Sequence, residues 1–310
     1  MNFQPLVTIC LPIYNPNREY FMALIDNIAN QTYKNMQIVI SDDAECPFVA
    51  DLISSDNRFQ YIKNEGKHGI FENLNHAFDF SCGDYIQIIC QDDLFEPNFI
   101  EKQLAIICSS LTIGFVYSQA HAINSRGTVI SRVTGEGHCI IPKEQLPRHF
   151  FLWGCIPGSL STVMLTKTAW IKNGRFREDL KFGGDFDYWI RLAENFDLGV
   201  NFEPTAYIRV HDESASSTLL ATQYVQDLII NYKVVYDRFE FPVVKKYLYL
   251  NAFISSSNLV RLLRDIQRGR ISVFSIFMLS NHPSSLFFAI FFIVFGKLRI
   301  DLRKRFVFGR

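Results

Sequence analysis

Apolar runs alternate with amphipathic stretches along the first part of the chain. Four apolar runs have the length of buried strands, at residues 6–13, 36–41, 59–62 and 85–90. The spacing of one helix face recurs between the first two runs, at Phe21, Leu24, Ile25 and Ile28. A second helix is predicted at residues 73–80. Strands separated by helices pair in parallel, so this pattern predicts an α/β fold with a mostly parallel sheet and helices on both faces.

Less regular patterns continue toward the C-terminus. Further strands are predicted at residues 114–122, 128–133 and 161–165, and further helices at residues 168–173, 186–195 and 219–265. We therefore expect three regions in the chain. These are an α/β domain over residues 1–217, a helical extension over 218–270 and a membrane-associating tail over 271–310.

The tail is apolar at first and basic at its end. Residues 271–296 contain no Asp, Glu, Lys or Arg, but their longest unbroken apolar run covers only residues 286–295. A spanning helix needs roughly 20 apolar residues, and Pro283 interrupts the longer stretch. Basic residues then dominate residues 297–310. We expect two in-plane or re-entrant segments followed by a basic anchor.

Charge is unevenly placed along the chain, although the formal net charge is zero. Residues 261–310 hold ten Lys or Arg and two Asp, so residues 1–260 carry an excess of eight acidic residues. Nine of the 29 Phe lie between positions 274 and 308. A segment that is both basic and rich in Phe favours an anionic membrane surface as partner over nucleic acid.

The seven cysteines are irregularly spaced and form no C-x-x-C motif. This argues against a disulfide framework or a zinc ribbon, and for a reducing compartment. The first ten residues hold no basic region and no long apolar run, so no secretory signal is expected. Together with the tail, these features predict a cytoplasmic protein that is peripheral on the cytoplasmic face of the inner membrane.

Pairs of acidic residues directly follow two of the predicted strands. Asp42-Asp43 follows residues 36–41, and Asp92-Asp93 follows the apolar run that ends near Cys90. Open α/β sheets bind ligands outside the carboxyl ends of their strands. Carboxylates there suit Mg²⁺ or Mn²⁺, and such an ion can stabilise a departing diphosphate. The alternative is a turn or a helix N-cap, but two acidic pairs side by side repel unless a cation or a donor-rich ligand lies between them.

Three further places carry candidate chemistry. Pro12, Tyr14 and Asn15 end the first strand, where a rigid turn would let a nucleotide base stack; a plain proline turn is the alternative. Asp185 follows a glycine pair and is a candidate general base, or simply the N-cap of its helix. His211 is a candidate metal ligand, or a packed surface histidine. No glycine-rich phosphate loop is present, so phosphate charge would have to be met by metal and side chains.

The motifs occur in an order that resembles one known family. They are Pro12-Ile13-Tyr14-Asn15, Gln31-Thr32, Asp42-Asp43, the asparagines Asn64, Asn73 and Asn75, Gly83-Asp84-Tyr85, Asp92-Asp93 with Pro97, and Gly184-Asp185 with Trp189 and Arg191. Over residues 6–217 the chain resembles the family 2 glycosyltransferases, which have the GT-A fold. Three positions depart from the usual pattern: Cys90 replaces the first Asp of the metal motif, Ala44-Glu45 replaces a Gly-Ser, and Gly184 replaces the Glu before the base.

The resemblance implies a reaction and assigns roles to residues. The reaction is inverting transfer of a sugar from a nucleotide diphosphate sugar to a hydroxyl of a glycan or lipid-linked acceptor, as in bacterial surface polysaccharide synthesis. Asp185 would be the base, and Mg²⁺ or Mn²⁺ would be held by Asp92, Asp93 and His211. Donor contacts would come from Pro12, Tyr14, Asn15, Asp42, Asp43, Asn64, Asn75 and Asp92.

Other functions compete with this one. A sugar-1-phosphate nucleotidyltransferase would have a glycine- and arginine-rich loop after the first strand, which residues 12–18 do not supply. A non-catalytic membrane-bound module that binds nucleotide sugars would not hydrolyse the donor. An enzyme that transfers sugar to polyprenyl phosphate would carry clearer spanning helices.

Overall fold

The computed structural model describes residues 4–211, 221–238 and 268–269. Its strands are β1 (Val7–Ile13), β2 (Met36–Asp42), β3 (Phe59–Lys63), β4 (Tyr85–Ile88), β5 (Leu94–Phe95), β6 (Ile113–Ile123), β7 (Val129–Ser131), β8 (His138–Ile141), β9 (Val163–Thr166) and β10 (Asp197–Arg209). Its helices are α1 (Arg18–Ala29), α2 (Pro47–Ile53), α3 (Ile70–Asp79), α4 (Phe99–Ile107), α5 (Leu146–Trp153), the 3₁₀ turn η1 (Leu160–Thr162), α6 (Lys167–Asn173), α7 (Gly184–Leu192) and α9 (Ala221–Asp237).

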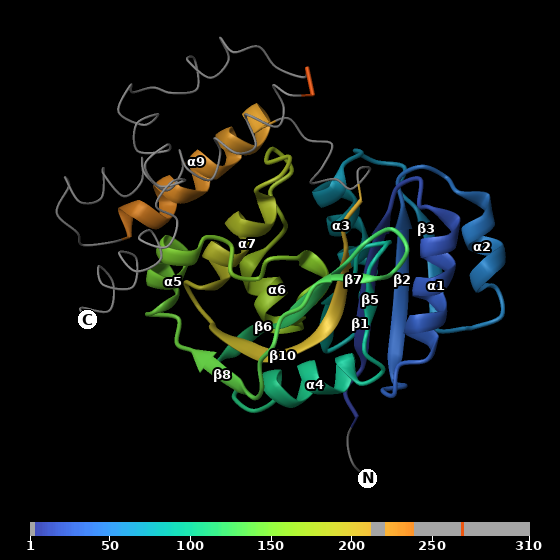
Figure 1. Cartoon of the computed structure of the whole chain (residues 1–310), viewed down its shortest axis with the longest axis horizontal. Coiled ribbons are helices and arrows are strands. Elements are labelled where there is room, and N and C mark those ends of the chain that lie inside the picture. Colours follow the sequence, from blue (N-terminus) through green and yellow to red (C-terminus); the bar gives the residue numbers. More distant parts are fainter. Residues whose placement is uncertain (1–3, 212–220, 239–267, 270–310) are drawn as a thin grey trace.

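The strands form one mixed sheet with the order β3-β2-β1-β4-β9-β6-β10-β5. Strands β1 to β4 pair in parallel with one another, and β6 pairs in parallel with β10. Strand β9 lies between β4 and β6 and is antiparallel to both. The predicted α/β fold with a mostly parallel sheet is therefore confirmed (Figure 1). Because β1, β2 and β4 are parallel neighbours, their carboxyl ends lie at one edge of the sheet.

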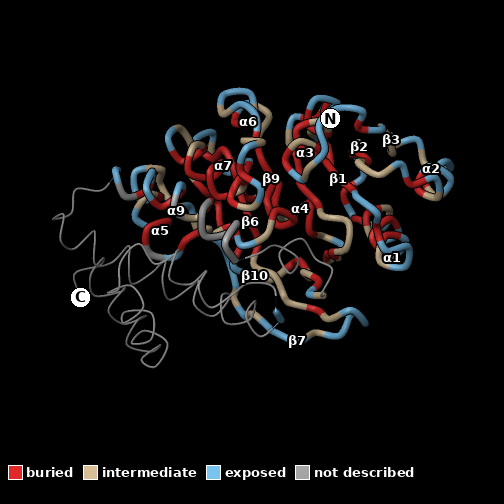
Figure 2. Tube along the Cα trace, turned by 90° about the horizontal axis from the view of Figure 1, so that it is seen from above, coloured by how far each residue is buried: buried red, intermediate tan, exposed pale blue. Residues whose placement is uncertain are grey.

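Helices cover both faces of this sheet. Alternate residues of a strand point to opposite faces, and β1 shows this directly. Its Ile9 and Leu11 belong to an apolar core shared with α1, α2 and α4, whereas Cys10 belongs to a second core with α3, α5, α6 and α7. The buried sheet runs through the middle of the molecule, while β7 is largely exposed at its periphery (Figure 2).

The longest strand of the described chain, β10, is absent from the sequence-based prediction. Its middle is exposed, and its register with β6 shifts between Asn201 and Ala206, on either side of Pro204. This irregularity breaks the alternation that identifies a strand in sequence. The strand matters because its end, Arg209, leads directly to His211.

The C-terminal predictions are met only in part by the described residues. Helix α9 falls in the predicted helical stretch 219–265 and packs on α5 and α7 (Figure 1). The predicted tail over 271–310 lies outside the described residues, as does most of the extension over 218–270. Among the residues described, no helix has the length and apolar character needed to cross a membrane.

Candidate active site

A buried amide on α3 fixes the edge of the sheet where the acidic pairs lie. Asn73 Nδ2 donates hydrogen bonds to the carbonyl oxygens of Ile13 and Ser41, both at 3.0 Å. Ile13 and Ser41 lie at the ends of β1 and β2, so one side chain ties both strand ends to the helix. The backbone positions at which the next loops begin are therefore held in place by hydrogen bonds.

The loop after β1 is joined to the loop after β4. The backbone N–H of Tyr14 donates to Gln91 Oε1 at 2.8 Å, and Gln91 Nε2 donates back to the Tyr14 carbonyl at 3.1 Å. Asn15 has a φ of 41°, in the left-handed region that asparagine tolerates better than most residues. The Tyr14 side chain is left 63% exposed. The predicted turn of Pro12, Tyr14 and Asn15 thus lies beside the metal motif, through a residue that the sequence analysis did not single out.

Asp42 is turned into the protein. It is fully buried, and its carboxylate accepts hydrogen bonds from the backbone N–H groups of Ala44 (2.8 Å) and Cys46 (2.6 Å) and from the Tyr61 hydroxyl (2.8 Å). Three donors satisfy a buried carboxylate and fix the turn after β2. A direct contact between Asp42 and a nucleotide base stays a prediction, and it would require one of these bonds to be exchanged.

Asp43 holds the loop that leads into α3. Its Oδ1 accepts from Asn64 Nδ2 at 2.6 Å, and its Oδ2 accepts from the backbone N–H of Gly69 at 2.9 Å. Asn64 also bonds within this loop, to Lys67 and Gly66. The predicted donor contacts Asp43 and Asn64 are therefore brought together, and they shape a loop next to the strand ends.

Asn75 lies elsewhere. It is buried, and it bonds both the carbonyl and the N–H of Phe176, at 3.0 and 2.9 Å. Its Nδ2 also lies 3.4 Å from Glu178 Oε1. Asn73, two residues earlier, faces the strand ends, whereas Asn75 ties α3 to the segment before α7. All the amide atoms of Asn75 are engaged in the protein, which does not support the predicted donor contact.

Asp92 and His211 form the polar pair at the end of β4. His211 Nε2 lies 2.6 Å from Asp92 Oδ2, although the residues are 119 positions apart in the chain. Both side chains remain partly accessible. One carboxylate oxygen and one imidazole nitrogen thus converge at the edge of the sheet, as predicted for two of the three metal ligands.

Asp93 is occupied differently from Asp92. It is buried; its Oδ2 accepts from the Ser161 hydroxyl at 2.5 Å, and its Oδ1 accepts from the backbone N–H of Arg209 at 2.9 Å. Burial and the negative charge of Asp92 raise the pKa of Asp93 to about 7, although both hydrogen bonds act in the opposite direction.

The predicted ligand set of Asp92, Asp93 and His211 stays a prediction, and the structure places its members differently. Within the part of the chain that the structure describes, no three His, Cys, Asp or Glu side chains are arranged to hold a metal ion. Asp92 and His211 come together, whereas the Asp93 carboxylate links η1 and β10 through Ser161 and Arg209.

Arg209 is a site residue that the sequence analysis missed. It is buried; its Nε donates to the Asp92 carbonyl at 2.9 Å, and its Nη1 donates to the carbonyls of Asn124 and Ser125. The guanidinium also lies over the Tyr20 ring, 4.3 Å from its centroid. Arg209, two residues before His211 in the chain, thereby fixes the backbone of Asp92. Its sequence neighbourhood offers no signal for this role, because all its partners are distant in the chain.

Asp185 lies in the first turn of α7. The N-cap of that helix is Gly183, so the alternative that Asp185 is the N-cap is wrong. Asp185 Oδ1 accepts from the backbone N–H of Phe186 at 2.7 Å, and Oδ2 lies 3.9 Å from Cys155 Sγ. Burial raises the pKa of Asp185 to about 6 and raises that of the Cys155 thiol well above its usual value. No cation pairs with Asp185 among the described residues.

The neighbouring Asp187 has a different role from Asp185. It pairs with Arg191 at 2.8 Å and with Arg177 at 3.6 Å. Of the two carboxylates in this turn, only Asp185 is left without a charged partner in the described part of the chain.

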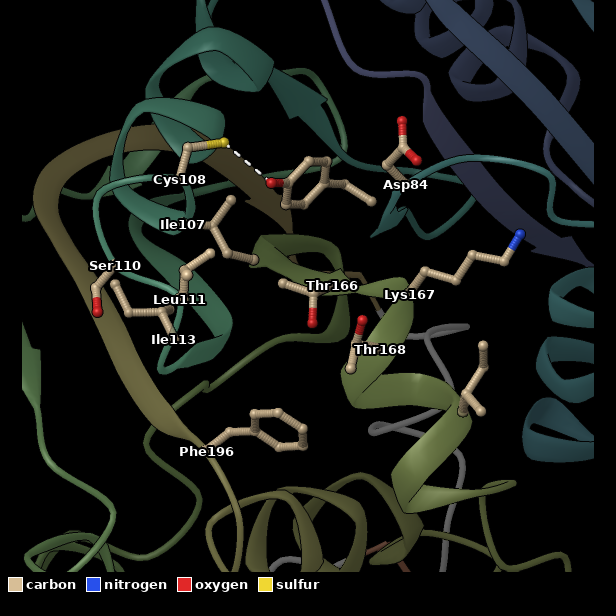
Figure 3. A pocket seen from close by; sticks show the side chains of 12 residues that line it. Asp84, Ile107, Cys108, Ser110, Leu111, Ile113, Thr166, Lys167, Thr168 and Phe196 are labelled. Carbon is tan, nitrogen blue, oxygen red and sulfur yellow. Dashed lines mark hydrogen bonds between the residues drawn. The ribbon is translucent and has the colours of Figure 1, made fainter.

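A cavity of about 470 Å³ lies at the opposite edge of the sheet (Figure 3). Tyr85, the first residue of β4, and Ile113, the first residue of β6, contribute to its lining together with Leu111 and Phe196. Asp92 follows the other end of β4. The cavity is therefore separate from the acidic strand ends and takes no part in the predicted site.

The comparison with known families decides the identity of this arrangement. A family model described as glycosyl transferase family 2 matches residues 8–156, just under half of the chain. This range contains the loop after β1 and both acidic pairs. The match places this part of the chain in glycosyl transferase family 2. Asp185 and His211 lie beyond the matched range, and it is the fold that brings His211 to Asp92.

Curated relatives of this family 2 protein include archaeal and bacterial glycosyltransferases. An uncharacterized glycosyltransferase of Methanocaldococcus jannaschii is 26% identical over 197 residues, which cover 62% of this chain and 66% of that protein. The putative glycosyltransferase EpsE of Bacillus subtilis is 25% identical over 242 residues, which cover 75% of this chain and 83% of EpsE. The family 2 chain thus spans about two thirds of the length of the archaeal relative.

The fold also resembles a solved structure. Staphylococcus aureus TarS, residues 1–349, in complex with UDP-GlcNAc, has a TM-score of 0.62 and 16% identity, covering 81% of this chain and 72% of that one. At this identity the likeness shows a shared fold, which agrees with the GT-A fold expected of a family 2 chain.

Proposed function

We propose that this glycosyltransferase moves a sugar, with inversion, from a nucleotide diphosphate sugar to a hydroxyl group of a glycan or lipid-linked acceptor. The observation that carries the proposal is the convergence of Asp92 and His211 at 2.6 Å, at the edge where β1, β2 and β4 end. A partly accessible carboxylate–imidazole pair at this edge suits recognition of a charged ligand.

The donor set of this pair fits a divalent ion. Carboxylate oxygen and imidazole nitrogen are both ligands of Mn²⁺, and Mg²⁺ sites use one or two carboxylates together with substrate phosphates. We propose that Asp92 and His211 hold the ion and that diphosphate oxygens and water complete its shell. When bound, such an ion supplies charge neutralisation for the departing diphosphate.

Asp185 is proposed as the general base. It removes the proton from the acceptor hydroxyl while that oxygen forms a bond to the anomeric carbon and the bond to the diphosphate breaks. A single displacement of this kind inverts the anomeric centre. Two features support the role: Asp185 has no charged partner among the described residues, and its pKa of about 6 lies close to neutral working conditions.

The position of Asp185 relative to the strand ends also supports this role. Asp185 follows Gly184, and a Cβ added at Gly184 would lie 2.6 Å from the ring of Phe71 on α3. Two residues further along α3, Asn73 bonds the ends of β1 and β2. The start of α7 therefore packs against the helix that frames the acidic edge.

The donor side is proposed to lie at the ends of β1 and β2. Tyr14 is exposed there and offers a ring against which a base can stack, next to the loop that Asp43 and Asn64 fix. TarS, which shares the fold, was solved with UDP-GlcNAc, so a uridine diphosphate sugar is the first donor to test. We also propose that the enzyme works on the cytoplasmic face of the inner membrane, through residues 271–310.

The deciding experiment measures release of nucleoside diphosphate from a panel of nucleotide sugars that includes UDP-GlcNAc, with and without Mn²⁺. We expect slow, Mn²⁺-dependent release from at least one donor by the full chain, and loss of release in Asp92→Asn. Binding of a donor, seen as a thermal shift, without any release would instead favour the non-catalytic binding module. Release of inorganic pyrophosphate from a nucleoside triphosphate and a sugar 1-phosphate would favour the nucleotidyltransferase.

A further inference from the structure

Helix α9 bonds the backbone at the start of α7 through two side chains one helical turn apart. Asp227 Oδ2 accepts hydrogen bonds from the backbone N–H groups of Phe182 (2.7 Å) and Gly183 (3.0 Å). Asn231 Nδ2 donates to the Gly183 carbonyl oxygen at 2.7 Å. Asp227 and Asn231 are both buried. The N–H and the carbonyl of Gly183 are therefore both bonded to α9.

The two glycines in this turn allow the close approach. A Cβ at Gly183 would lie 2.8 Å from Asn231 Nδ2 and 2.9 Å from Asp227 Cβ. A Cβ at Gly184 would lie 2.6 Å from the Phe71 ring on α3. The absence of side chains at this glycine pair lets α9 and α3 pack directly against the turn from two sides.

Helix α9 stays with α7 beyond this turn. The rings of Tyr232 and Phe186 meet at 5.6 Å between centroids, and Arg238 at the end of α9 donates to the Ile190 carbonyl and pairs with Glu194. The two helices therefore run side by side in the same direction (Figure 1). Asp227 and Asn231 are the contacts of α9 that reach the backbone directly before Asp185.

We propose that Asp227 and Asn231 are positioning residues for the base Asp185. Asp185 lies two residues after Gly183, so fixing both backbone groups of Gly183 sets where the first turn of α7 begins and where the carboxylate lies. A general base must be held in place, because a displacement of about 1 Å can cost 10²-fold in rate. The inference rests on the proposed function for the role of Asp185, and it extends the catalytic unit to a helix beyond residues 1–217.

A purely structural role for α9 makes a different prediction. If α9 only covers the apolar core, any variant that weakens its packing acts on stability alone. Val235→Ala is the matched control, since Val235 is 1% exposed on the same helix and its side chain has no group that can hydrogen-bond to Gly183. Asn231→Ala removes the bond to the Gly183 carbonyl without changing charge. Asp227→Asn keeps an oxygen acceptor but removes the charge, and Asp227→Ala removes both.

The kinetic test uses the full chain, Mn²⁺ and the nucleotide sugar that the wild type turns over fastest in the panel with UDP-GlcNAc. We expect kcat to fall about 10- to 100-fold in Asn231→Ala and Asp227→Ala, with donor KM changed less than about twofold. We expect Asp227→Asn to recover most of the loss. Val235→Ala should keep kcat at temperatures below its own unfolding transition.

A second readout does not need a substrate. The difference in Tm between the wild type and Asp185→Asn changes with pH as Asp185 ionises, and the same difference is measured in the Asn231→Ala background. Two other groups near Asp185 can affect this pH dependence. Cys155 contacts the Asp185 carboxylate, and Asp227 on α9 bonds the turn that precedes it. Asn231→Ala alters neither of them. A released turn admits water to Asp185, so we expect the pH midpoint to move downward.

The outcomes separate this inference from the proposed function. No donor turnover by the wild type would refute the proposed function, and the pH readout would still test whether α9 positions Asp185. An active wild type with unchanged kcat and unchanged pH midpoint in Asn231→Ala and Asp227→Ala would overturn the inference. The same holds if Val235→Ala lowers kcat as much as the two α9 variants.

Discussion

Asp92 Oδ2 and His211 Nε2 lie 2.6 Å apart across 119 residues of sequence. The contact depends on β10, which returns the chain to the end of β4. Two residues before His211, Arg209 bonds the Asp92 carbonyl and places its own N–H on Asp93. The polar pair therefore forms only when β10 is in register with β6.

The first prediction concerns this pair. Asp92→Asn and His211→Ala should each lower Mn²⁺-dependent donor turnover by at least about 10–100-fold. Mutating a residue that merely supports a metal ligand already costs this much, and a ligand itself should cost no less. Chelation of the metal should lower wild-type turnover in the same way. The measurement is rate against Mn²⁺ concentration, with His138→Ala as the control, because His138 is exposed on β8. An unchanged Mn²⁺ dependence in both variants would remove the pair from the metal site.

The second prediction separates Asp93 from Asp92. Asp93→Ala leaves the Ser161 hydroxyl and the Arg209 N–H without their buried acceptor, at about 1–3 kcal/mol each. We expect a lower Tm and a weaker effect in Asp93→Asn, which keeps one acceptor oxygen. The Mn²⁺ concentration for half-maximal turnover should change little in Asp93→Asn. If it rises as much as in Asp92→Asn, Asp93 is a ligand after all.

The third prediction is the pH dependence of turnover. Asp185 has a pKa of about 6 and accepts a proton only when ionised, so kcat/KM, which reports ionisation in the free enzyme, should rise with pH through an apparent pKa near 6. Asp185→Asn should lower kcat by about 10²–10⁴-fold, with donor affinity nearly unchanged. Loss of donor binding with normal turnover of bound donor would make Asp185 a donor-site residue.

The fourth prediction follows from the same pKa by linkage. The folded-state pKa of Asp185, about 6, lies above the ordinary value of 3.8, so folding favours its protonated form. The corresponding stability is present below pH 4 and is lost as pH rises through 6. Asp185→Asn has no charge to bury, so its Tm relative to wild type should be higher at pH 8 than at pH 4. A constant difference would contradict the raised pKa.

The fifth prediction concerns Gly83, just before β4. A Cβ there would lie 2.6 Å from the Thr8 backbone nitrogen in β1 and 2.8 Å from the carbonyl oxygen of Leu6 just before it, and the backbone at the start of a buried strand has little freedom to move. Gly83→Ala should therefore destabilise the protein by about 1–3 kcal/mol, the usual cost of overpacking. Gly158→Ala is the matched control, because nothing lies within 4 Å of its Cβ position. Equal urea midpoints for the two variants would contradict the prediction.

The last prediction concerns residues 271–310, which the structure does not describe. Each basic residue near an anionic leaflet contributes about 1 kcal/mol, and apolar insertion adds binding that salt does not screen. The full chain should float with anionic liposomes, and high salt should release it only in part. Removing residues 271–310 should abolish flotation while leaving donor turnover. A full chain that does not bind the liposomes at low salt would contradict membrane association. The apolar run would then serve in a buried core or in an oligomer contact.

Local pattern sufficed for much of the fold and for some of the site. The runs that became β1, β2 and β4 are apolar because both faces of these strands are covered, and such runs are visible without knowing their neighbours. Asp92 could be singled out because it follows an apolar strand, and Asp185 because it follows a glycine pair at the start of a helix. β10 could not, because its register shift and exposed middle hide its strand pattern.

The strand pattern was enough to predict where the acidic side chains gather, because the carboxyl ends of parallel strands meet at one edge of the sheet whatever the helices do. Which of these carboxylates is available to a ligand depends on contacts made in the folded chain. Ser161 and Arg209 donate hydrogen bonds to the Asp93 carboxylate, and Tyr61 donates one to Asp42. Asp92 instead pairs with His211. A carboxylate becomes structural or functional according to the donors around it. Those donors come from segments far away in the chain, so no local pattern reveals them.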